Sequence, residues 1–63
     1  MLTFEIPNMT CGHCVRAVTE AVKAADPGAL VECDLPSHRV QVQTSASREA
    51  VLAQLTEAGY APA

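Results

Sequence analysis

The spacing of apolar side chains changes several times along this chain, and the order of these changes constrains the fold more than any other feature. Residues 2–6 alternate apolar with polar side chains, which is the period of a half-buried strand. Over residues 14–25, valine and alanine recur at helical spacing until Pro27-Gly28 interrupts the pattern. Alternation returns over residues 30–35. The first half of the chain is therefore predicted to be strand, helix and strand.

The second half continues this pattern. Pro36-Ser37-His38 has the composition of a hairpin turn that leads into a strand around Val40 and Val42. A second helix is expected from Ser47, a typical N-cap residue, to Gly59 at its C-terminal end. Only residues 60–63 remain for a last strand, which must be very short.

This order of elements predicts one α+β domain over residues 1–63, with a four-stranded antiparallel sheet and two helices on one of its faces. Right-handed crossovers make the first and second strands run in the same direction. The loops at 8–14, 36–39 and 58–60 must then emerge at the same end of the sheet. We expect these three segments to meet at one tip of the domain.

Composition narrows the class of protein. A chain of 63 residues buries only about 60% of its unfolded surface, so a large catalytic cleft is not expected. Four basic and seven acidic residues give a net charge of −3 without a basic cluster, which argues against nucleic acid as a partner. No apolar segment reaches the roughly 18 residues that insertion in a membrane requires, and no leader is apparent. We expect a free-standing cytoplasmic protein with its three cysteines reduced.

The candidate functional site is the pair Cys11 and Cys14, placed where a strand ends and a helix begins. The positive end of a helix favours thiolate over thiol, and Gly12 between the cysteines is interpreted as allowing a tight turn. Soft sulfur ligands select Cu(I), whereas structural zinc requires four ligands. Only two ligands are certain at this tip, with His13 and His38 as candidate secondary or cluster ligands. The site is therefore predicted to bind Cu(I).

Other interpretations remain open. The same loop could bind mercury or zinc, and a pair of cysteines could instead act as a thiol-disulfide oxidoreductase, although the chain is short for such an enzyme. His38 is also explained as a solvated turn residue, and His13 as a residue that tunes the acidity of the thiols. Cys33 is in phase with Val31 and Leu35, so we expect it to pack in the core rather than bind metal.

Residues 9–14, which read Met-Thr-Cys-Gly-His-Cys, together with Gly59-Tyr60 after the second helix, resemble the heavy-metal-associated domain family, and within it the small bacterial copper chaperones. The resemblance covers essentially the whole chain. It implies a ferredoxin-like βαββαβ fold without enzymatic activity, in which Cys11 and Cys14 bind Cu(I) and pass it to a P-type copper-transporting ATPase. It also implies that Met9 and Tyr60 support the metal loop. Two loaded tips could meet in a copper-bridged homodimer.

Overall fold

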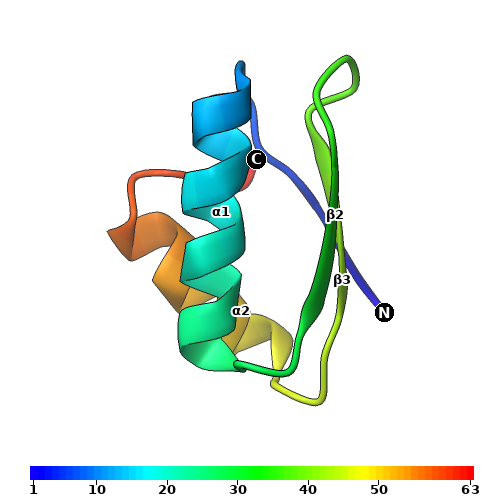
Figure 1. Cartoon of the computed structure of the whole chain (residues 1–63). Coiled ribbons are helices and arrows are strands. Elements are labelled where there is room, and N and C mark those ends of the chain that lie inside the picture. The colour runs from blue at the N-terminus through cyan, green and yellow to red at the C-terminus, as the bar shows by residue number, and fades with distance from the viewer.

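A computed structural model describes all residues, 1–63, and its five elements match the first five of the predicted order (Figure 1). Both helices pack on one face of the sheet, as expected, and the polypeptide forms an α+β fold of two layers. The elements are β1 (Leu2–Glu5), α1 (Gly12–Ala25), β2 (Leu30–Asp34), β3 (Arg39–Gln43) and α2 (Arg48–Glu57).

The sheet has three strands and not the four that were predicted. Its order is β1-β3-β2, and both pairs are antiparallel, with Val40 of the central strand opposite Phe4 and Cys33. Residues 60–63 run beside β1 but form no strand, since only the Ala63 N–H bonds to it, at 2.7 Å from the Glu5 carbonyl. This segment has four residues, one of which is a proline without an N–H, and is too short to form a ladder.

The core lies between the sheet and the helices and consists of aliphatic side chains around Phe4. The inward positions of β1 and β3 alternate with exposed polar ones, as the period of two requires. No polar or charged side chain is buried. The core therefore gains its stability from apolar burial alone, and its eleven members are Phe4, Ile6, Met9, Val18, Ala21, Val22, Ala29, Val40, Val42, Val51 and Leu55.

Helix α2 has well-defined signals at both ends. The Ser47 hydroxyl accepts a hydrogen bond from the Ala50 N–H at 3.1 Å, which confirms the predicted N-cap. At the other end Gly59 has φ 90°, and the N–H of Tyr60 bonds to the Leu55 carbonyl at 2.9 Å. This is the Schellman pattern, which requires a left-handed residue at the position of Gly59. It turns the chain sharply and sets the direction in which Tyr60 leaves the helix.

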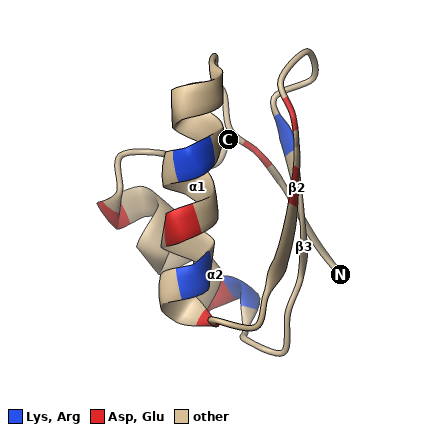
Figure 2. Ribbon diagram, in the orientation of Figure 1, with Lys and Arg blue, Asp and Glu red and all other residues tan.

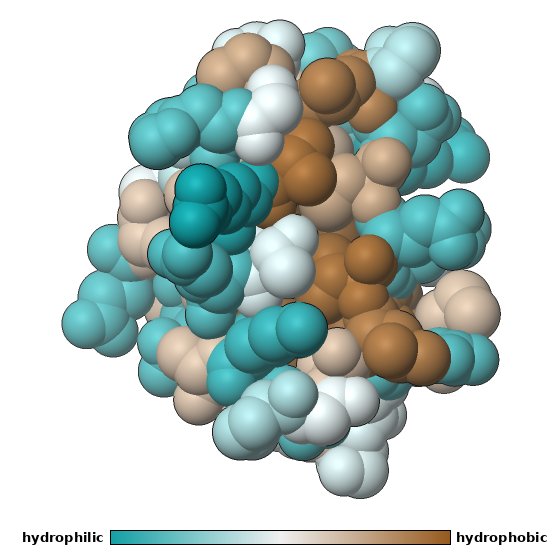
Figure 3. Space-filling view, viewed as in Figure 1, coloured by the Kyte–Doolittle hydropathy of each residue, from teal (hydrophilic) through white to brown (hydrophobic).

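The surface of α1 is mixed in charge and partly apolar. Basic and acidic bands alternate along the helix (Figure 2), and Arg16 and Glu20, one turn apart, form an exposed ion pair at 3.7 Å. Apolar atoms reach the surface along the boundary between α1 and the sheet (Figure 3). Half-buried apolar side chains of α1 and β2 include Val15, Val31 and Cys33. No helix has the length and apolar character needed to cross a membrane.

Candidate metal site

The three segments predicted to converge do meet at one tip of the domain. The loop after β1 is tied to the β2–β3 hairpin by two hydrogen bonds: the Ile6 N–H donates to the His38 carbonyl at 2.7 Å, and the His38 ring contacts the Met9 carbonyl at 2.9 Å. The Asn8 side chain donates to the Gly59 carbonyl, at 3.4 Å, and so joins the segment after α2. Figure 1 shows the start of α1 and the hairpin at this same end.

Cys11 and Cys14 bring their sulfur atoms together at the tip, 3.4 Å apart and not bonded as a disulfide. Cys11 is the N-cap of α1 and is exposed, while Cys14 lies in the first turn and is half-buried. The Cys11 side chain makes no capping hydrogen bond, so no backbone N–H of the first helical turn occupies its sulfur. The first N–H groups of a helix lack partners and carry partial positive charge, which favours negative charge on nearby sulfur.

The environment of Cys14 stabilises its thiolate. Hydrogen bonds lower the pKa of Cys14 from its usual 9.0 to about 6: the largest effect comes from the Tyr60 side chain, followed by the Thr10 backbone and the Cys11 side chain. Partial burial opposes them. The same contact with Cys14 raises the pKa of Tyr60, which therefore keeps its proton and donates it. At neutral pH the tip thus presents a sulfur anion next to a second, exposed sulfur.

The residues expected to support the loop behave differently from one another. Met9 is completely buried in the core, and Tyr60 lowers the pKa of Cys14, as described. Gly12, however, is the first residue of α1, with helical backbone, and a side chain there would meet no neighbouring atom within 4 Å. The backbone between the cysteines is the start of the helix and does not use the conformational freedom of glycine, and a supporting role of Gly12 in the loop stays a prediction.

The other candidate ligands lie around the cysteines rather than among them. His13 is exposed in the first turn of α1, and His38 directs Nδ1 to the Met9 carbonyl. Cys33 is half-buried against the core, and this burial raises the pKa of its thiol, in agreement with the expected packing role. No three His, Cys, Asp or Glu side chains come together in an arrangement that could hold a metal. Ligation by either histidine stays a prediction.

Two contributors to the site were not singled out from the sequence. Thr10 acts through its backbone, because only an N–H can lower the pKa of a thiol by hydrogen bonding, and no side-chain pattern reports this. Asn8 holds the segment that carries Tyr60. Asn8 follows Pro7 in the loop after β1, and a contact that spans 51 positions leaves no local pattern in the sequence.

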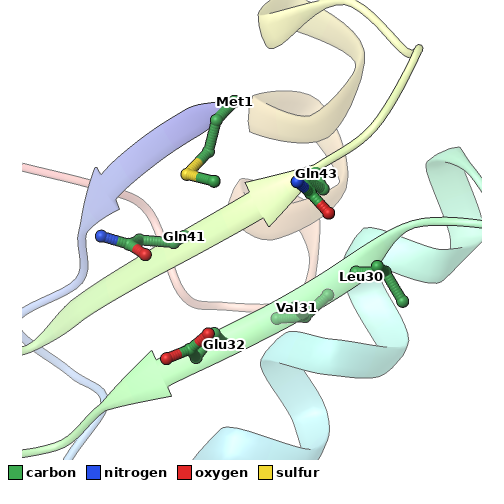
Figure 4. A pocket seen from close by; sticks show the side chains of 6 residues that line it. All are labelled: Met1, Leu30, Val31, Glu32, Gln41 and Gln43. Atoms are coloured by element: carbon green, nitrogen blue, oxygen red, sulfur yellow. The ribbon is translucent and has the colours of Figure 1, made fainter.

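The surface has a depression that does not include Cys11 or Cys14. It lies at the end of the sheet remote from the cysteines and is open to solvent (Figure 4). Its wall consists mainly of glutamine and aliphatic side chains and has no thiol or imidazole: Met1, Leu30, Val31, Glu32, Gln41 and Gln43. This depression therefore does not include the Cys11–Cys14 pair.

Comparison with known sequences supports this description. The profile of the heavy-metal-associated domain matches residues 3–61. Copper-transporting ATPase 2 of Rhizobium meliloti (strain 1021) is 39% identical to this chain over 61 residues. That match covers 94% of this chain but only 7% of the ATPase, so the chain spans a small part of that relative.

Solved structures with the same architecture include a copper chaperone and a gold-binding protein. Copper chaperone Atx1 from Synechocystis PCC6803, a His61Tyr variant in a trimeric form, superimposes with a TM-score of 0.96 at 30% identity over 100% of both chains. A gold-binding protein superimposes with a TM-score of 0.93 at 37% identity, over 98% of this chain and 95% of the other. Both similarities cover nearly the whole of this chain, including the residues of the tip.

Proposed function

This chain belongs to the heavy-metal-associated domain family, whose members are metal-binding domains and not enzymes, and we propose that it is a cytoplasmic copper chaperone. In this proposal Cys11 and Cys14 bind Cu(I) and deliver it to a P-type copper-transporting ATPase. Similarity to a copper chaperone over the full length, and to a segment of a copper-transporting ATPase, supports the assignment.

The observation that carries the proposal is the pairing of the two sulfurs, 3.4 Å apart, with the pKa of Cys14 lowered to about 6. Thiolates are the soft ligands that Cu(I) prefers. Two thiolates around a monovalent ion leave one negative charge on the site. The positive end of α1 stabilises that charge, as helix N-termini do for anions.

Exposure of the site suggests how the metal leaves. Cys11 is exposed at the surface, so a thiolate of a partner can approach an ion that has only two sulfur ligands. The incoming sulfur adds as a third ligand, after which one of the original sulfurs departs. Transfer by ligand exchange releases no free ion, and its direction depends on relative affinity and on export by the transporter.

The receiving protein is proposed from the chemistry of the site and from the relatives. A partner with its own pair of cysteines on a similar fold would present a matching surface, and the copper-transporting ATPase contains a segment 39% identical to this chain. Two loaded copies of the chain could also share copper through their tips in a homodimer, in which His13 and His38 would be secondary ligands.

A second candidate is binding of another soft metal at the same cysteines. The likeness to a gold-binding protein, at 37% identity, favours this possibility over redox catalysis. Gold and mercury share with copper a preference for sulfur. Zinc, which usually requires four ligands, fits two sulfurs less well.

Metal competition tests the function. Reduced protein should be titrated with Cu(I) without oxygen, in the presence of a chelator that competes for the ion, and then mixed with the cysteine-containing domain of a copper-transporting ATPase. We expect one Cu(I) per chain, sulfur coordination by X-ray absorption, and transfer on mixing. Tighter retention of Zn(II) than Cu(I), or absence of copper–sulfur bonds, would contradict the proposal.

A further inference from the structure

The tip of the domain has an unusual composition for an exposed surface. Residues 6–15, 35–38 and 58–62 contain no lysine, arginine, aspartate or glutamate, although the chain has four basic and seven acidic residues. Figure 2 shows the start of α1 and the end of the β2–β3 hairpin without a coloured band. Burial does not explain this, because Asn8, Thr10 and Pro36 are exposed, as charged residues normally are. We call these three segments the uncharged tip.

The charges that border the uncharged tip have neighbours of opposite sign. Arg39 of the central strand lies opposite Asp34 on one side and opposite Glu5 on the other. On α1, Arg16 pairs with Glu20 at 3.7 Å. Basic and acidic groups are therefore interspersed around the tip, and no field of a single sign extends over it.

The uncharged tip is one connected surface. Its segments are joined by the hydrogen bonds of His38 to the loop after β1 and of the Asn8 side chain to the Gly59 carbonyl. The exposed residue Cys11 lies on this surface. A partner that reaches the sulfur of Cys11 must therefore lie against it.

Transfer by ligand exchange requires close contact at this surface. A sulfur of the partner must come within bonding distance of an ion held by Cys11 and Cys14, so the partner covers the residues beside them. Charged side chains that become covered lose their water, which costs free energy unless they are well paired. The uncharged tip has no such side chains. It also lacks the patch of one sign that attracts a partner over long distances.

We propose that the uncharged tip is the docking surface for the cysteine-containing domain of a copper-transporting ATPase, and that it fits a partner surface that is itself uncharged. The copper-transporting ATPase that resembles this chain contains a segment of matching size, 39% identical over 61 residues. Recognition then depends on shape and on the exchange of sulfur ligands, not on attraction between opposite charges. This inference rests on the proposed function and adds the kind of surface that the partner presents.

The dependence of transfer on salt tests the proposal in the unmodified chain. Copper-loaded protein is mixed with the ATPase domain at about pH 8, where imidazole side chains are uncharged. The second-order rate constant of transfer is measured from about 0.02 M to about 0.5 M salt, a range over which interactions between exposed charges become screened. We expect it to change by less than about twofold, whereas steering by opposite charges would make it fall about tenfold or more.

Charges of both signs at one position of the tip give the second test. Pro36 is exposed in the hairpin turn and has no backbone N–H, so Pro36→Glu and Pro36→Lys remove no hydrogen bond of the turn. Relative to Pro36→Gln, each should slow transfer by roughly tenfold, because either charge must lose its water against an uncharged partner. Gln43→Glu and Gln43→Lys are the matched controls at the remote end of β3, and should transfer copper like the unmodified chain.

The outcomes separate this inference from the proposed function. Opposite effects of the two charges at position 36, or a fall of about tenfold with salt, would indicate docking by charge and overturn the proposal. Equal rates in all three Pro36 variants would also overturn it, because the hairpin would then lie outside the interface. In these cases transfer still occurs and the proposed function stands. Absence of transfer at every salt concentration would contradict the proposed function, and the docking surface with it.

Discussion

The Cys14 sulfur lies 3.4 Å from the sulfur of Cys11, whereas the third thiol of the chain, Cys33, packs against the core from the edge strand β2. The three cysteines thus divide into a pair at the tip, of which Cys11 is exposed and Cys14 half-buried, and a single residue on the sheet. Neither Cys11 nor Cys14 is among the eleven buried core residues, although Cys14 packs against them, so metal binding and folding can be tested separately.

Replacing Cys11 or Cys14 with serine should abolish tight Cu(I) binding, because one remaining thiolate cannot hold the ion against a competing chelator. The fold should persist, as neither residue belongs to the buried core. Competition titration and circular dichroism measure the two effects. Cys33→Ser is the matched control: it should keep the affinity and lower the melting temperature, since a half-buried apolar sulfur is replaced by a hydroxyl.

Tyr60→Phe should raise the pKa of Cys14 from about 6 toward its usual 9.0, because it removes the largest hydrogen bond to the sulfur. The thiolate absorbance of Cys14, followed against pH in a Cys33→Ser background, measures the change. In the parent chain, Cu(I) affinity should fall as the pH drops below about 6, where protons compete for the sulfur. In the Tyr60→Phe variant this fall should begin at higher pH.

The same shift affects stability. Because the folded pKa of Cys14 lies below the usual value, its ionisation contributes stability that is complete above pH 9.0 and is lost as the pH falls toward about 6. The free energy of unfolding should therefore rise with pH across this interval, and Tyr60→Phe should reduce the slope. An identical slope in both proteins would show that Tyr60 does not stabilise the thiolate.

Arg48→Ala should lower the free energy of unfolding by about 1 kcal/mol. Its guanidinium lies 4.5 Å from the centre of the Phe4 ring and donates to the Thr3 carbonyl at 3.2 Å. Thr3 lies on the edge of β1 that the missing fourth strand leaves open. Arg16→Ala is the control, because its pair with Glu20 is exposed (82% and 73%) and such pairs contribute little. Equal effects in urea denaturation would contradict the proposed role of Arg48.

The two glycines near the tip should respond in opposite ways to alanine. Gly59→Ala should destabilise the fold by about 1 kcal/mol, since its φ of 90° strains any side chain even though the space is free. Gly12→Ala should be neutral or stabilising by up to about 1 kcal/mol, because alanine is the better helix former. Thermal unfolding of the two variants measures the direction of both stability changes. A loss of stability in Gly12→Ala would indicate that the backbone at this position does require glycine.

Most of the fold was predictable because the period of apolar residues is a local property. The change of period located the strands and helices, and Ser47 marked a helix start through its own hydroxyl. The fourth strand was predicted wrongly. Residues 60–63 were predicted to be a strand because the expected fold has a fourth one. Four residues are too few to show an apolar period, so the sequence itself gave no evidence for that strand.

The candidate site was predictable only in part. The spacing of Cys11 and Cys14 identifies them as a candidate pair, and the predicted topology places Tyr60 at the same tip. The contact between His38 and Met9 spans 29 positions and depends on one backbone angle and one side-chain rotamer. Such geometry leaves no pattern in a single sequence. For the same reason Gly12 was assigned a conformational role that helical backbone does not require.

The guanidinium of Arg48 also occupies part of the open edge of β1, through its hydrogen bond to the Thr3 carbonyl. An open strand edge invites pairing with another molecule, which is a common route to aggregation. Here a foreign strand would have to displace a cation from the Thr3 carbonyl and bring its own backbone beside that charge. Arg48 therefore places a positive charge and an occupied carbonyl on the open edge of β1, which makes pairing with a foreign strand less favourable there.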